Sequence, residues 1–147
     1  MIEIENFLHK NICKYLIDYF KQNKIHSKKF HKRSLISLLD FPVDDNIVLN
    51  IINLYKKIKP SSKLCHMELL YWPPGESHDW HDDTIYYDYT TITNLNDNFI
   101  GGETIVEKYK VIPKTGKIIL FNANKIHKVN ILEKGERYVI VAWYKNG

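Results

Sequence analysis

The first third of the chain has apolar residues at the spacing of helices. Between residues 10 and 22 the apolar side chains recur every three or four positions, which places them on one face of an amphipathic helix. A second run with this spacing begins after Asp44 and Asp45, either of which can accept the first free backbone amides, and Pro60 ends it. The pattern predicts two helices, preceded by a short strand or lead-in segment over residues 2–8.

From about residue 63 onward the pattern changes to that of strands. β-Branched and aromatic residues dominate the runs at residues 67–72, 86–93, 117–121 and 137–144. Clusters of glycine, proline and asparagine separate these runs, as turns do. Two helices followed by seven or eight short strands predict a mainly β fold, an antiparallel jelly-roll barrel with two supporting amino-terminal helices.

The length and composition fit a single domain in a reducing compartment. A chain of 147 residues has the size of one domain, and we expect helical support over residues 1–62 and a barrel core over residues 63–147. Cys13 and Cys65 lack the spacing of a disulfide framework, which predicts buried free thiols and a cytoplasmic protein. The acidic start does not resemble a signal peptide, and no apolar run has the length of a membrane span, so no membrane partner is expected.

One stretch of the sequence is strongly basic. Residues 21–33 contain six lysine or arginine residues and no acidic residue, in a chain of net charge +4. Such a stretch can bind phosphates or an acidic partner. A solvated loop after the first helix is the simpler interpretation, and we prefer it.

The candidate metal ligands lie in the strand-rich part of the chain. His81 and Asp83 flank Asp82, so their side chains leave the same face of an extended strand. His127 follows near the end of another strand-like run. Two imidazoles and one carboxylate form the ligand set that holds ferrous iron on one face and leaves the opposite positions open. We therefore expect His81, Asp83 and His127 to bind a metal ion.

Several other polar residues lie close to these ligands in the sequence. His78 and Asp82 point to the other face of an extended chain. We expect these two residues and Asp79 to support the ligands from outside or to face solvent. Glu103 follows two glycines, which favours a turn residue that enters the next strand.

Arg137 is the one cation of the last apolar strand. It shares a face with alternate residues up to Trp143. A guanidinium among apolar side chains needs an anionic partner, since desolvating it alone is costly. That partner is either the carboxylate of a cosubstrate, which a guanidinium binds through two parallel hydrogen bonds, or a carboxylate of the chain, such as Glu136 or Glu103.

Taken together, these residues resemble the 2-oxoglutarate and Fe(II)-dependent oxygenases, and within them the prolyl 4-hydroxylase-like branch. The segments that carry the resemblance are residues 69–71, 75, 81–83, 101–104, 113–116, 118–121, 127–129, 135–138 and 143–144. The resemblance implies a double-stranded β-helix, with His81, Asp83 and His127 as the catalytic iron ligands. It also implies Fe(II), 2-oxoglutarate and O2 as cofactors, with ascorbate as a further candidate.

The resemblance also implies roles for three residues around the cosubstrate. Arg137 matches the residue that binds the distal carboxylate of 2-oxoglutarate. Tyr71 matches a tyrosine that hydrogen-bonds the cosubstrate, ten residues before the first histidine. Trp143 matches an aromatic residue that lines the same pocket. Some relatives have threonine where this chain has Val141, which removes one cosubstrate contact.

The activity implied by the resemblance is hydroxylation of an unactivated carbon, with release of succinate and CO2. A prolyl residue in a peptide or protein is the first expectation, and a small-molecule substrate is the second.

Two alternatives stay open at this point. A nucleic-acid dealkylase of the same superfamily would use the basic stretch, but such enzymes have a second arginine where this chain has Trp143, so nucleic acid is not expected as a partner. A cupin-type metal-binding barrel is also compatible, because Gly75, His81 and Asp83 imitate the opening of the cupin metal motif and Asp88 is able to supply its carboxylate.

Overall fold

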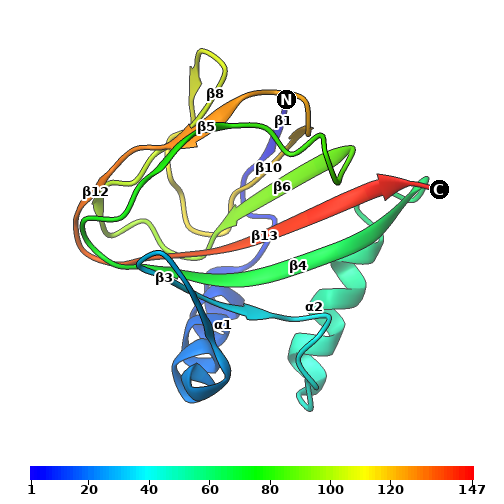
Figure 1. Ribbon diagram of the computed structural model, residues 1–147. Helices are drawn as coiled ribbons and strands as arrows, with labels where there is room; N and C mark the ends of the chain where they lie inside the picture. The colour runs from blue at the N-terminus through cyan, green and yellow to red at the C-terminus, as the bar shows by residue number, and fades with distance from the viewer.

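Antiparallel sheets, with two helices beneath the larger one, make up the computed structural model of residues 1–147 (Figure 1). The helical elements are α1 (Lys10–Gln22), the short 3-10 helix η1 (Lys24–His26) and α2 (Asn46–Lys56). The strands are β1 (Ile2–Ile4), β2 (Lys28–Phe30), β3 (Arg33–Ser37), β4 (Ser62–Trp72), β5 (His78–His81), β6 (Tyr89–Asn94), β7 (Ile100–Gly101), β8 (Thr104–Val106), β9 (Tyr109–Lys110), β10 (Ile118–Asn122), β11 (His127–Val129), β12 (Leu132–Lys134) and β13 (Arg137–Asn146).

The strands are arranged as a jelly roll. The larger sheet has the order β1-β10-β6-β13-β4-β3-β2, and a four-stranded sheet, β5-β11-β8-β9, faces it across the interior. A two-stranded ribbon, β12-β7, lies at one end of the molecule. The predicted mainly β jelly roll with two amino-terminal helices is therefore confirmed, although its strands remain in separate sheets and do not close into one hydrogen-bonded barrel.

The two helices form where the sequence pattern predicts them. The side chain of His9 accepts a hydrogen bond from the Asn11 amide at the start of α1, and Asp45 accepts one from the Val48 amide at the start of α2. Both caps satisfy backbone donors that have no partner inside the helix. Helix α2 ends at Lys56, shortly before Pro60.

Strand β13 separates the interior into two cores. Its residues Tyr138, Ile140, Ala142 and Tyr144 belong to the core beneath the larger sheet, to which α1 and α2 contribute their apolar faces. The other face of β13 looks toward the smaller sheet, where Val139 packs in a second apolar core. The alternation predicted for residues 137–144 is thus confirmed.

The amino-terminal part of the chain contains more strand than its sequence predicts. Strand β3 pairs with β4, and β1 pairs with β10, so residues 1–62 contribute three strands to the larger sheet besides the two helices. The basic stretch is not a loop, because residues 28–30 form a hairpin strand paired with β3. The sequence did not predict this hairpin, because strands are recognised by alternating apolar residues and residues 28–30 are mostly lysine.

Neither cysteine is paired. Cys13 is buried and Cys65 is half-buried, so the prediction of two free thiols is confirmed and the prediction of full burial holds for Cys13 alone. No helix combines the length and the apolar character that a membrane span requires.

Gly116 is predicted to be essential for attaching the start of the chain to the sheet. Its φ is +83°, and a Cβ atom at this position would lie 2.1 Å from the backbone oxygen of Leu8. Because the Leu8 amide donates to the Gly116 oxygen at 3.1 Å, the clash cannot be relieved without loss of that bond. Gly116→Ala should lower the free energy of unfolding by more than about 1 kcal/mol in urea denaturation. Gly147→Ala, whose Cβ would meet nothing within 4 Å, is the control, and equal stabilities would contradict the prediction.

Candidate active site

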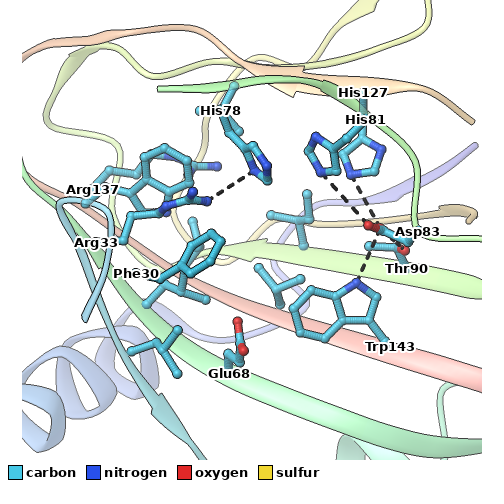
Figure 2. Close-up of a pocket in the computed structure, with 17 residues that line it drawn as sticks. Phe30, Arg33, Glu68, His78, His81, Asp83, Thr90, His127, Arg137 and Trp143 are labelled. Atoms are coloured by element: carbon cyan, nitrogen blue, oxygen red, sulfur yellow. Dashed lines mark hydrogen bonds and ion pairs between the residues drawn. The ribbon is translucent and has the colours of Figure 1, made fainter. Parts of the chain in front are cut away.

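Strand pairing brings the two predicted histidine ligands together. His81 on β5 lies directly opposite His127 on the neighbouring strand β11. Asp83 follows β5, and its amide donates to the Ala123 oxygen at 2.9 Å, which holds the backbone in place beyond the strand. One ligand atom from each of the three residues lies within 4.8 Å of the others. The structure therefore brings His81, Asp83 and His127 together as a candidate metal site (Figure 2).

Both imidazole rings are oriented by backbone carbonyls. Nδ1 of His81 lies 2.8 Å from the Asp79 oxygen, and Nδ1 of His127 lies 3.0 Å from the Lys125 oxygen. Since a carbonyl only accepts, each Nδ1 carries the proton and each Nε2 presents its lone pair. These Nε2 atoms lie 3.9 Å and 3.4 Å from the carboxylate of Asp83. Burial lowers the pKa of His127, which favours the neutral form that a metal requires.

The larger sheet fixes the carboxylate of Asp83. Oδ2 accepts a hydrogen bond from Thr90 Oγ1 at 2.8 Å and another from Trp143 Nε1 at 3.3 Å. Oδ1 has no such donor and remains available to a metal ion. Trp143 thus lines the cavity beside the candidate ligands and also orients the carboxylate of Asp83. The sequence did not reveal this orienting role for Trp143 or for Thr90.

The triad lies at one end of a cavity of about 270 Å³ between the two sheets. Its walls are mainly apolar, and all four residues predicted to share the inner face of β13 contribute to them, namely Arg137, Val139, Val141 and Trp143. Arg137 lies toward the opposite end of the cavity from the triad (Figure 2). The cavity therefore joins a metal site to a buried cation.

Arg137 has no anionic partner in the chain. It is only 2% exposed, its Nη2 donates to Thr104 Oγ1 at 3.1 Å, and its Nε is buried without any hydrogen bond. No carboxylate lies within ion-pair distance of it. Burial lowers the pKa of Arg137 to about 9, and the nearby charge of Arg33 acts in the same direction. An internal partner is therefore excluded, and the guanidinium is available to an external anion.

Glu103 and Glu136, the internal partners weighed for Arg137, have other environments. Glu103 accepts a hydrogen bond from Asn130, and Glu136 is exposed.

Tyr71 does not reach the cavity, so its predicted cosubstrate contact is wrong. Its ring packs beneath the larger sheet, with its centroid 6.0 Å from that of Phe20 and 5.3 Å from that of Tyr138. Neighbouring strand residues face opposite sides, and it is Trp72 that lines the cavity. The Trp72 indole lies over the guanidinium of Arg137 at 4.9 Å, and its buried Nε1 has no acceptor. Trp72 pairs directly with Arg137 across β4 and β13. This strand pairing shows that Trp72, and not Tyr71, lies beside the guanidinium.

The other polar residues that lie near the candidate ligands in the sequence do not join the metal cluster. The His78 ring stacks on His81, with centroids 3.7 Å apart, and both residues line the cavity. The expectation that His78 faces the opposite side is therefore wrong, whereas the expectation that it supports a candidate ligand is met. Asp79 and Asp82 are exposed. Asp88, the carboxylate that a cupin would need, accepts from the Asn146 amide instead and is not part of the metal cluster.

Comparison with known families agrees with this geometry. The chain matches the family described as the 2OG-Fe(II) oxygenase superfamily over residues 67–145, more than half of its length. The chain belongs to the 2OG-Fe(II) oxygenase superfamily. This membership decides against the cupin alternative. No curated protein matches the oxygenase in a sequence comparison.

Solved structures share the fold of this oxygenase at low sequence identity. The viral collagen prolyl hydroxylase of Paramecium bursaria Chlorella virus-1, in its 2OG complex, has a TM-score of 0.70 and 18% identity, covering 99% of this chain and 95% of that chain. A Pseudomonas putida prolyl-4-hydroxylase has a TM-score of 0.75 and 13% identity, covering 99% and 92%. The epimerase SnoN, solved with Fe3+, alpha ketoglutarate and nogalamycin RO, has a TM-score of 0.75 and 12% identity, covering 99% and 78%.

Asp83→Asn should greatly weaken iron binding, while the neighbouring Asp82→Asn should not. The first change removes the only charged ligand, and loss of a direct ligand should exceed the roughly 10–100-fold cost of losing a group that only orients one. The second changes an exposed carboxylate that bonds Thr84. Anaerobic titration with Fe(II), with thermal denaturation to verify folding, measures both variants. Comparable losses in the two would contradict the assignment of Asp83.

Proposed function

We propose that this oxygenase is an Fe(II)- and 2-oxoglutarate-dependent dioxygenase that hydroxylates an unactivated carbon of a prolyl residue in a peptide or protein, with release of succinate and CO2. The observation that carries the proposal is the buried, unpaired guanidinium of Arg137 in the cavity that also contains the metal-binding triad. A cosubstrate with a metal-chelating keto acid at one end and a second carboxylate at the other matches this arrangement.

The residues present fit both the metal and the cosubstrate. His81, Asp83 and His127 provide a donor set of two nitrogens and one oxygen, which suits ferrous iron and leaves positions open. When bound, the iron with 2-oxoglutarate and O2 supplies the oxidising power for attack on a C–H bond. The protein contributes the geometry of the ligands and the charge that receives the cosubstrate.

Two buried donors are available to the distal carboxylate of the cosubstrate. Arg137 presents its guanidinium, whose orientation is fixed by Thr104. Trp72 presents the N–H of its indole, which has no acceptor in the chain. We assign to Trp72 the hydrogen bond expected of Tyr71, since a buried donor without an acceptor carries a free-energy cost that a bound carboxylate removes.

The apolar walls keep water away from the reacting centre. Leu70, Ile92, Val129, Val139 and Val141 line the cavity between the iron site and Arg137. In such surroundings the charged contacts to the cosubstrate are stronger than in water. The side chains also exclude water from the space in which the substrate carbon must approach the metal.

Aromatic side chains beside the iron site support a ring-shaped substrate. Tyr87 stacks on Trp143 with centroids 5.6 Å apart, and both line a second hollow that adjoins Asp83. A proline ring can pack on such surfaces. Two of the similar structures are prolyl hydroxylases, whereas SnoN is an epimerase in nogalamycin biosynthesis, so a peptidyl substrate is the first candidate and a small molecule the second.

Arg137→Met should weaken 2-oxoglutarate binding by roughly 2–5 kcal/mol, the cost of truncating one partner of a buried charge pair. Binding of pyruvate, which has no distal carboxylate, should hardly change. Anaerobic calorimetry on the iron-loaded protein measures both acids, with the exposed Lys134→Met as the matched control. Equal losses for the two acids would show that Arg137 maintains the fold and does not bind the cosubstrate.

Turnover should add one oxygen atom to a proline-containing peptide. The product should require iron and 2-oxoglutarate, and a chelator should abolish it, with ascorbate present to keep the iron reduced. Mass spectrometry of the peptide and an assay of succinate, read together, measure coupling between the two half-reactions. Loss of an alkyl group from methylated oligonucleotides, with no peptide product, would instead establish the dealkylase.

A further inference from the structure

A second guanidinium lies in the wall of the cavity and has no role in binding iron or 2-oxoglutarate as assigned above. Arg33, at the start of β3, is 5% exposed and lines the same cavity as the metal triad. It is the last residue of the basic stretch, whose lysines are mostly exposed. Figure 2 shows it on the same side of the cavity as Arg137, with its guanidinium directed toward His78.

The contacts of Arg33 fix its guanidinium in one orientation. Its carbon Cζ lies 4.9 Å from the ring centroid of Phe30 and 4.6 Å from that of Trp72. Nη1 donates to Nδ1 of His78 at 3.1 Å. Nε lies 3.3 Å from Oε2 of Glu76. A guanidinium held in this way loses little conformational freedom when it binds a ligand.

These contacts leave part of the hydrogen-bonding capacity of Arg33 unused. Nε is ion-paired with Glu76 at 3.3 Å without a well-aligned hydrogen bond, and Nη2 has no partner in the chain. The two oxygens of Glu76 accept hydrogen bonds from the Lys32 and Ser77 amides at 3.0 Å and 2.9 Å. A closer approach of Glu76 to Arg33 would therefore break these bonds. A nine-tenths buried cation with unused donors therefore faces the cavity.

Arg33 is also close to the reacting centre. His78, which accepts its hydrogen bond, stacks on the iron ligand His81 with ring centroids 3.7 Å apart. A group bound to Arg33 is thus separated from an iron ligand by a single imidazole ring. Phe30, which covers the guanidinium, is 52% exposed on the edge strand β2, so this part of the cavity is near the solvent.

We propose that Arg33 binds a carboxylate of the substrate, so that the hydroxylated residue is a free amino acid or the carboxyl-terminal residue of a peptide. This inference rests on the function proposed above and specifies its substrate class. A planar guanidinium discriminates a carboxylate from an amide, because the carboxylate accepts two parallel, charge-assisted hydrogen bonds. A cavity of about 270 Å³ that must also hold the cosubstrate fits one small residue.

The test compares acids with their amides. The probes are L-proline, a peptide that ends in proline, the carboxyl-terminal amides of both, and a peptide with internal proline. The other standard amino acids are tested in the same way, each as a pair of free acid and amide. Binding to the protein loaded with Fe(II) and 2-oxoglutarate, without oxygen, is measured by calorimetry, and KM is measured with oxygen. Each preferred acid should bind at least about tenfold more tightly than its amide. L-Proline and the peptide acid separate the two sources of the carboxylate.

The variants separate recognition from structural support. Arg33→Met should abolish the preference for the acid over the amide and leave 2-oxoglutarate affinity unchanged, while Arg33→Lys should retain part of the preference. Lys29→Met, an exposed lysine of the same hairpin, is the control. Equal losses for acid and amide in Arg33→Met would show that Arg33 only anchors the hairpin, and a loss of 2-oxoglutarate affinity would assign it to the cosubstrate.

Two further outcomes overturn the inference without affecting the proposed function. One is hydroxylation of the internal-proline peptide as efficiently as of the acids. The other is the absence of binding by every free acid, with 2-oxoglutarate binding and uncoupled succinate formation intact. Loss of 2-oxoglutarate binding by the unmodified protein would instead refute the proposed function itself.

Discussion

The site depends on a buried positive charge that the chain does not neutralise. Arg137 lies in the cavity with one neutral hydrogen bond and no carboxylate nearby. Leaving a desolvated guanidinium unpaired costs several kcal/mol or more, so the surrounding structure must hold it there. Strand β13 does so, because it is paired along its length with β4 and from Val139 to Tyr144 also with β6. Binding of an anion to Arg137 would remove this free-energy cost.

The candidate metal site draws its residues from both of the sheets that enclose this charge. His81 and His127 come from neighbouring strands of the smaller sheet, whereas Asp83 is bonded by Thr90 and Trp143 of the larger one. A metal ion bound to all three residues therefore links the sheets at one end of the cavity. The anion on Arg137 would link them at the other, since Thr104, which orients the guanidinium, belongs to β8 of the smaller sheet.

The sequence predicted those features that depend on local periodicity. Alternation placed Arg137 on the inner face of β13. His81 and Asp83 lie together as expected, although Asp83 lies beyond the end of β5 and not on its face. The cosubstrate contact that the resemblance implied for Tyr71 was wrong, because a shift of one residue along a strand moves a side chain to the opposite face. The sequence did not distinguish Arg33 from the neighbouring lysines of the basic stretch. Its burial depends on contacts with Glu76 and Trp72, which are distant in sequence. Such contacts follow from strand order, which periodicity does not specify.

The two guanidiniums of the cavity differ in one respect that assigns their roles. Trp72 contacts both, at 4.6 Å from Arg33 and 4.9 Å from Arg137, and each charge disfavours the other. Arg33 has a carboxylate beside it in Glu76, whereas Arg137 has none. The greater deficit of negative charge is therefore at Arg137, which supports the proposal that Arg137 binds the distal carboxylate of the cosubstrate. Arg33 is already partly compensated by Glu76, so it offers its remaining donors to the carboxylate that we propose for the substrate.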